Sequence, residues 1–117
     1  MAVEVNPFFK LYFMTKPTKI RAKIKKDFID FRMLMHHVME TGLRKDQVTG
    51  ELIPAWFIKE FSINLNGEEI ISGKLGPTMS KNPYLRCNIK GEIGDLISVR
   101  WTDNKGEERV DEATVKA

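Results

Sequence analysis

The residues best suited to chemistry lie close together in the stretch MLMHHVMETGLRKD, residues 33–46. Three methionines and two histidines occupy the seven positions from Met33 to Met39. On an extended strand, side chains two positions apart point to the same face, so Met33, Met35, His37 and Met39 would lie together. Copper accepts thioether and imidazole ligands, and a periplasmic copper-binding β-sandwich is therefore one hypothesis.

The same pattern also fits a buried strand, and we favour this interpretation. Met33 and Met35 continue an apolar face that begins in the preceding residues DFIDFR, and methionine at every second position is typical of a sandwich core. His37 would then lie at the rim, where the strand leaves the sheet. A zinc site is disfavoured because the only two histidines, His36 and His37, are adjacent and point to opposite faces.

No other catalytic constellation is indicated, so neither enzyme activity nor a cofactor is predicted. The sequence holds no GxSxG, P-loop or dinucleotide-binding motif. The single cysteine, Cys87, alternates with Leu85 and Ile89 on an apolar face, and we expect a buried thiol that is labelled slowly. One cysteine also excludes an internal disulfide.

Length and composition indicate one globular domain. The chain has 117 residues, of which 42% are hydrophobic and 30% charged. The net charge is +3, but 19 Lys and Arg are interleaved with 16 Asp and Glu, so nucleic acid is not an expected partner. No stretch approaches the roughly 20 apolar residues of a membrane span. The N-terminal run MAVEVNPFFKLYFM lacks the pattern of a signal peptide.

Alternating apolar residues, broken by turn residues at short intervals, predict strands along most of the chain. Asn66-Gly67 predicts a tight hairpin, and residues 40–53 read as a long polar connection. The pattern predicts an all-β fold, an antiparallel β-sandwich of about seven strands. We expect this domain to span residues 19–117, after an N-terminal extension over residues 1–18. The predicted strands lie within residues 19–26, 27–37, 56–66, 68–74, 84–90, 96–102 and 107–115.

Four separated blocks resemble the Z subunit of the Sox carrier complex of thiosulfate oxidation: HHVMETGLRKD, IPAWFI, GPTMSKNPYL and WTDNKGEERVDEATV. The resemblance runs from about Lys19 to the C-terminus. It implies an immunoglobulin-like sandwich that forms a heterodimer with the Y subunit, whose C-terminal Gly-Gly-Cys arm holds the sulfur intermediate. It also implies a periplasmic location, reached by export together with the signal-bearing partner.

The family motif METG-x-RKD is intact here, and its charged residues Glu40, Arg44, Lys45 and Asp46 form a loop that either orients partners or is simply solvated. Two positions depart from the family pattern: Val38 replaces the usual proline, and Trp56 replaces the usual histidine. An aromatic such as Trp56 suits an interface anchor, although it would equally suit a core position. The partner-binding candidates are His37, Met39, Glu40, Thr41, Arg44, Lys45, Asp46 and Trp56.

The resemblance therefore implies a non-catalytic scaffold subunit of the carrier heterodimer, and the absence of a catalytic motif agrees with it. It would present the carrier, through transient contacts, to the heme, hydrolase and dehydrogenase enzymes of the Sox system. A strand edge and its neighbouring loops would bury against the partner, because an open sandwich edge needs a cover. Trp56 and the Phe8–Phe9 segment are the candidate anchors of that interface.

Overall fold

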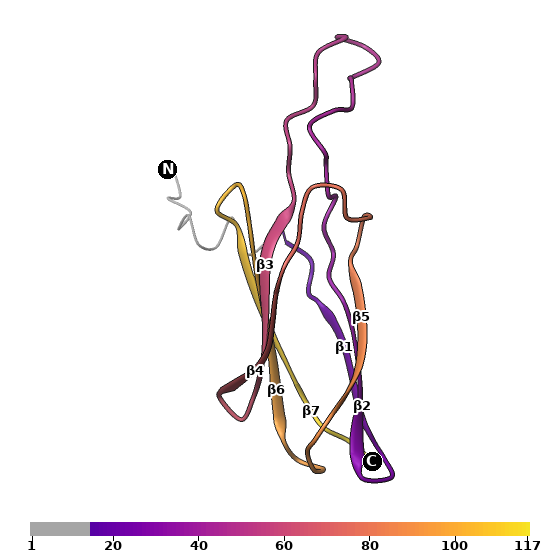
Figure 1. Ribbon diagram of the computed structural model, residues 1–117, viewed down its shortest axis with the longest axis vertical. Helices are drawn as coiled ribbons and strands as arrows, with labels where there is room; N and C mark the ends of the chain where they lie inside the picture. The colour runs from indigo at the N-terminus through magenta and orange to yellow at the C-terminus, as the bar shows by residue number, and fades with distance from the viewer. Residues whose placement is uncertain (1–14) are drawn as a thin grey trace, which may run out of the picture.

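In the computed structural model, which describes residues 15–117, the chain forms seven strands and no helix, arranged as two antiparallel sheets (Figure 1). This confirms the predicted immunoglobulin-like β-sandwich. One sheet has the strand order β1-β2-β5 and the other β4-β3-β6-β7. The candidate anchor Phe8–Phe9 lies outside the described residues. The strands are β1 (Lys19–Lys25), β2 (Phe28–Leu34), β3 (Ile58–Leu65), β4 (Glu68–Lys74), β5 (Tyr84–Ile89), β6 (Leu96–Asp103) and β7 (Glu108–Thr114).

The hairpin predicted at Asn66-Gly67 is confirmed. Leu65 of β3 pairs with Glu68 of β4, which leaves two residues in the turn. Asn66 and Gly67 have φ angles of 51° and 86°. Tight hairpin turns of the type that matches strand twist need positive φ at both central positions, and Asn and Gly tolerate it best. This turn fixes the register of the β3–β4 pair.

The core lies between the two sheets and follows the alternation of the sequence. Met33 and Met35 are both buried there, so the core interpretation of the methionine pattern is confirmed. Each large side chain moved from water into such a core stabilises the fold by about 1.5–3 kcal/mol. The fully buried side chains at the centre include Ile29, Phe31, Met33, Ile58, Ile63, Ile97, Val99 and Trp101.

Cys87 lies on β5 opposite Phe31 of β2 and packs against this core. The residue is half-buried rather than fully buried, which corrects the expected degree of burial. Burial raises the pKa of the Cys87 thiol. Since the thiolate is the reactive form, slow labelling remains the expectation.

The two sheets are joined along one side by the residues that follow β7. Lys116 accepts a hydrogen bond from Ile24 and donates one to Ala22 of β1. Within residues 15–117, β4 and β5 are each the last strand of their sheet. No helix in this part of the chain is long and apolar enough to cross a membrane.

Candidate functional site

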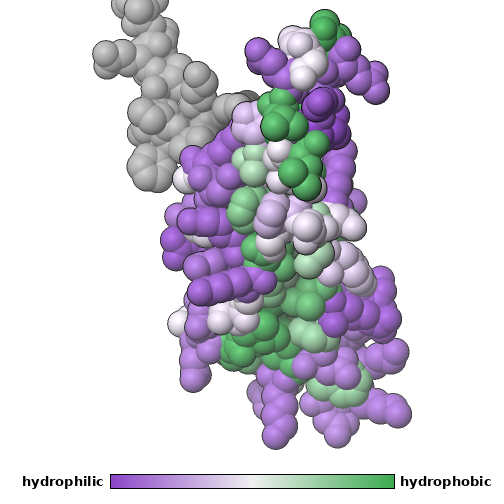
Figure 2. Space-filling model, turned by 45° about the horizontal axis from the view of Figure 1, so that its top comes forward, coloured by the Kyte–Doolittle hydropathy of each residue, from purple (hydrophilic) through white to green (hydrophobic). Residues whose placement is uncertain are grey.

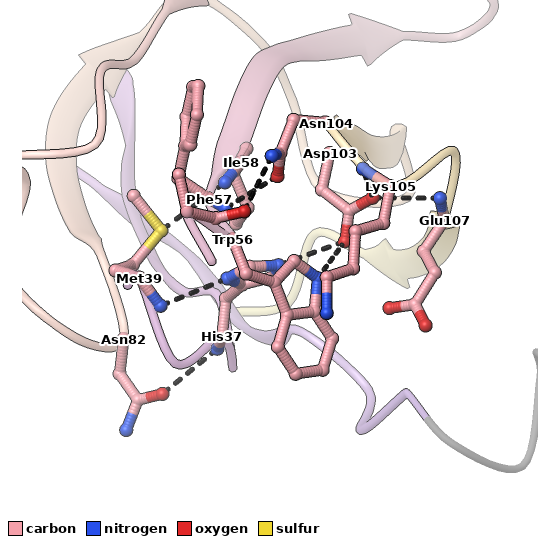
Figure 3. A network of polar contacts seen from close by, with 11 residues as sticks. His37, Met39, Trp56, Phe57, Ile58, Asn82, Asp103, Asn104, Lys105 and Glu107 are labelled. Carbon is pink, nitrogen blue, oxygen red and sulfur yellow. Dashed lines mark hydrogen bonds and ion pairs between the residues drawn. The ribbon is translucent and has the colours of Figure 1, made fainter. Parts of the chain in front are cut away.

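A buried carboxylate, Asp103 at the end of β6, is the centre of a polar network (Figure 3). The residue is only 2% exposed. Its Oδ2 accepts hydrogen bonds from His37 Nε2 at 3.0 Å and Trp56 Nε1 at 2.8 Å. Its Oδ1 accepts from the backbone N–H groups of Lys105 at 3.0 Å and Glu107 at 2.8 Å. Asp103 therefore ties the chain that leaves β2 and the chain that enters β3 to the β6–β7 turn.

His37 is held at both ring nitrogens. Nδ1 accepts the backbone N–H of Met39 at 3.2 Å, so the proton lies on Nε2, which donates to Asp103. The residue is 7% exposed, and its backbone exchanges two 3.0 Å hydrogen bonds with Asn82 in the loop before β5. His37 thus lies just beyond the end of β2, as predicted, but it is a buried structural residue.

This geometry bears directly on the copper hypothesis. Copper would need a free imidazole lone pair, and the lone pair of His37 Nδ1 is already used. The sulfur of Met39 also accepts a hydrogen bond, from Ile58 N–H at 3.3 Å. Among residues 15–117, no three His, Cys, Asp or Glu side chains are grouped so that they could hold a metal ion. The contacts of His37 and Met39 therefore favour a structural role over metal binding.

Trp56 is half-buried and forms the outer wall of the network. Its ring lies edge-on to His37, with ring centroids 5.3 Å apart. Lys105 Nζ lies 4.1 Å from the centroid of the Trp56 ring, a cation–π contact. Trp56 is therefore not a core residue, and its side chain already has partners within the domain. Its indole N–H donates to Asp103, and one face of its ring contacts the ammonium group of Lys105.

From this network an arm, defined here as residues 40–56, extends beyond both sheets at the top of Figure 1. Its two sides are paired at its base, where Glu40 and Trp56 exchange backbone hydrogen bonds of 2.6 and 3.0 Å. Farther out, Lys45 and Leu52 form a second antiparallel bridge. The predicted polar connection is therefore a ribbon with its own backbone pairing.

Polar side chains of the arm bond mainly to the arm itself. Arg44 forms an ion pair with Glu40, and this hydrogen bond lowers the pKa of the Glu40 carboxyl. Thr41 Oγ1 accepts the N–H of Leu43 at 3.0 Å. Asp46 Oδ1 accepts two backbone N–H groups near the tip, which lower the pKa of the Asp46 carboxyl. These residues hold the shape of the arm.

The arm exposes apolar side chains that no other part of residues 15–117 covers. Leu43, Val48 and Leu52 are 81%, 94% and 58% exposed. Figure 2 shows apolar side chains among hydrophilic ones over this upper part of the molecule. Three exposed apolar side chains on one projecting ribbon offer contact area for another protein.

A family model described as sulphur oxidation protein SoxZ matches residues 18–114. This chain belongs to the SoxZ family. Membership confirms the resemblance and implies a role in sulfur oxidation, with partners within the Sox system. No curated protein was found to match the chain.

In this SoxZ chain the eight predicted partner-binding residues fall into two groups. His37, Met39 and Trp56 belong to the network at the base of the arm. His37 and Trp56 do face each other across Asp103, at the two positions where the family pattern has histidine. Because Trp56 supplies a donor and no acceptor, this pair suits the bonding of a carboxylate. The other five candidates, Glu40, Thr41, Arg44, Lys45 and Asp46, lie along the arm.

Sequence reasoning missed Asp103 and Asn82, which hold the base of the arm, and the apolar residues Leu43, Val48 and Leu52 on it. The sequence did contain a signal for these three apolar residues, since apolar residues inside a polar, turn-rich connection have no sheet face to occupy. For Asp103 the DNKG context indicated a turn and nothing more. Whether any of the eight candidates contacts a partner remains a prediction.

A pocket of about 270 Å³ lies beside the network and is lined in part by Trp56, Trp101, Lys16, Lys81 and Glu107. Glu107 is buried, and burial raises the pKa of its carboxyl, with the charge of Asp103 adding to the effect. A raised carboxyl pKa means that the folded state binds the proton more tightly than the unfolded state does. This contribution to stability is therefore most favourable below pH of about 4 and is lost as pH rises through the raised pKa.

Glu107→Gln is accordingly expected to raise the thermal unfolding midpoint at pH 7, by roughly a few degrees. The gain should shrink as pH falls, because below pH of about 4 the glutamate is itself neutral in both states. Calorimetry of both proteins between pH 4 and 8 measures the difference. Glu112→Gln, at an exposed position of β7, is the matched control and should show little change. A lower midpoint for Glu107→Gln at pH 7 would contradict the prediction.

Proposed function

We propose that this protein is the non-catalytic scaffold subunit of the sulfur-carrier heterodimer of thiosulfate oxidation. It pairs in the periplasm with the Y subunit, which holds the sulfur intermediate on its C-terminal cysteine arm. It also helps to dock that carrier to the other Sox enzymes. The observation that carries the proposal is the arm of residues 40–56, which presents apolar side chains from a rigid base in a chain of the SoxZ family.

The construction of the arm supports a binding role. Its base is fixed by the buried bonds of Asp103 to His37 and Trp56, and its body by backbone pairing. A surface that is already ordered loses little conformational entropy when it binds, so more of the contact energy appears as affinity. Leu43, Val48 and Leu52 supply apolar contact area, and the charged Arg44 and Lys45 supply orientation.

The use of the polar groups supports a scaffold in preference to a catalyst. A general acid or base must reach the substrate with a free donor or acceptor. His37 and Asp103, the buried pair that most resembles catalytic machinery, use their side-chain atoms on each other, on Trp56 and on backbone N–H groups. The half-buried Cys87 on β5 has a raised thiol pKa, which is unfavourable for a sulfur-bearing nucleophile.

The proposal is tested by co-expression with the Y subunit and size-exclusion chromatography. A one-to-one heterodimer is expected, with an interface above about 1,000 Å². Alkylation of the cysteine on the Y-subunit arm should abolish thiosulfate-dependent turnover by the reconstituted enzymes, whereas Cys87→Ser should leave turnover unchanged. Failure to associate, or loss of turnover in Cys87→Ser, would overturn the carrier-scaffold assignment.

A further inference from the structure

The outer face of the sheet β1-β2-β5 is strongly basic. Alternate residues of each strand point away from the core, and on β1 all four of these are exposed cations. Arg32 on β2 and Arg86 on β5 extend the set across the sheet. We call this surface the basic face, defined by Lys19, Arg21, Lys23, Lys25, Arg32 and Arg86.

Strand register brings three arginines into one row across this face. Arg21 pairs with Arg32, and Arg32 pairs with Arg86. Like charges directly opposite each other on neighbouring strands are destabilising, and sheets ordinarily avoid them. Asp30 offsets part of this repulsion by pairing with Arg32 and Arg86, and a bound anionic surface would relieve the rest.

One acidic side chain, Asp30 on β2, shares the face. Its carboxylate lies 3.1 Å from Arg32 Nη2 and 3.3 Å from Arg86 Nε, and the bond from Arg32 lowers the pKa of the Asp30 carboxyl. The four β1 cations form no ion pair within residues 15–117. Six cations and one carboxylate leave +5 on this face, more than the +3 of the whole chain.

One end of the basic face carries a shallow apolar concavity of about 520 Å³. Leu34 and the exposed Tyr84 line it on the outside, and Lys19, Arg21 and Arg32 surround it. An apolar centre with a charged rim is the usual anatomy of a protein–protein interface. The β1 row is about 20 Å long, which is the scale of a protein surface and far exceeds a small anion.

We propose that the basic face docks an acidic surface of a protein other than the Y subunit, namely one of the Sox enzymes that act on the carrier. The inference rests on the proposed function, since it supplies the surface for the transient contacts of the scaffold. Charge complementarity of this kind accelerates encounter and fixes orientation without giving long-lived binding. The apolar concavity at one end of the face favours a protein surface over a phosphate backbone or lipid phosphates, which are bound chiefly through charge.

The test uses the wild-type heterodimer and two doubly charge-reversed forms of it. Arg21→Glu with Lys23→Glu alters two exposed, unpaired cations of the basic face. The control, Lys59→Glu with Lys74→Glu, makes the same change in net charge at two exposed positions of the opposite sheet. Association with each purified heme, hydrolase and dehydrogenase Sox enzyme is measured by stopped flow at about 50 and 300 mM salt.

With at least one enzyme, we expect wild-type association to slow at high salt and the basic-face variant to associate about tenfold more slowly at low salt. The control should stay within about twofold of the wild type. Equal rates for all three proteins with all three enzymes would overturn the proposal. So would basic-face-dependent binding to anionic lipid vesicles or duplex DNA in place of an enzyme.

Pairing with the Y subunit separates failure of this inference from failure of the proposed function. If the wild type does not form the heterodimer, the proposed function itself fails. If the wild type pairs and Arg21→Glu with Lys23→Glu does not, the basic face belongs to the Y-subunit interface, and its assignment to a second partner is wrong. Normal pairing of all three proteins, with slowed association of the basic-face variant alone, supports both proposals.

Discussion

Replacing Asp103 with alanine is expected to lower the free energy of unfolding by about 3–5 kcal/mol. Four donors lose their acceptor at once: the side chains of His37 and Trp56 and the backbone N–H groups of Lys105 and Glu107. Each donor left buried without a partner costs about 1–3 kcal/mol, and the effects of neighbouring donors overlap. Urea unfolding, followed by tryptophan fluorescence, measures the loss.

Asp103→Asn separates the two halves of the network. The amide keeps one oxygen as an acceptor but turns an N–H donor toward one pair of donors, so we expect an intermediate loss of about 2 kcal/mol. This variant also gives a measurement if the alanine form does not fold. Glu112→Ala, on the exposed side of β7, should stay within about 0.5 kcal/mol of the wild type. A loss below about 1 kcal/mol for Asp103→Ala would show that the network is not a major source of stability.

The sequence was sufficient for the sandwich because its signals are local. Alternation in KIRAKIK and FIDFRML predicts β1 and β2, and the Asn66-Gly67 turn predicts the register of β3 with β4. Hydrophobic period and turn chemistry act over a few residues, so one sequence reveals them. The same local alternation placed Met33 and Met35 correctly in the core.

The network at the base of the arm could not be predicted in the same way. His37 and Asp103 are separated by 66 positions, and neither has a local pattern that names the other. Burial still alternates beyond Leu34, where β2 ends, so Met35, His37 and Met39 are all buried, although Met39 has a positive φ of 53°. What the alternation could not show is that His37 Nδ1 and the Met39 sulfur are both used as hydrogen-bond acceptors within the domain.

The basic face was only partly visible in the sequence. Four of its six cations alternate in KIRAKIK with no carboxylate between them, whereas Arg32 and Arg86 lie in later strands. Pairing of Arg21, Arg32 and Arg86 across three strands gathers them, and that register is a long-range property of the fold. To predict a cluster of charges on a sheet, one therefore needs the strand register as well as the composition.

Replacing both Leu43 and Val48 with aspartate is expected to weaken the heterodimer with the Y subunit at least about 100-fold. Both side chains lie on the arm and are more than four-fifths exposed. Full burial of a Leu or Val side chain contributes about 1.5–3 kcal/mol, and burying two carboxylates in their place adds a desolvation cost. Because neither side chain supports the core, the thermal midpoint of the isolated subunit should hardly change. Isothermal titration calorimetry with the Y subunit measures the affinity.

The matched control replaces two exposed apolar residues elsewhere, Ile93 and Val110, with aspartate. It adds the same two charges and removes a similar apolar area, but Ile93 lies in the β5–β6 loop and Val110 on β7, both outside the arm. This control should bind the Y subunit within about threefold of the wild type. If the control loses affinity and Leu43→Asp with Val48→Asp does not, the Y subunit docks on the sandwich. The arm would then be free for another protein, and the observation that carries the proposed function would have to be reassigned.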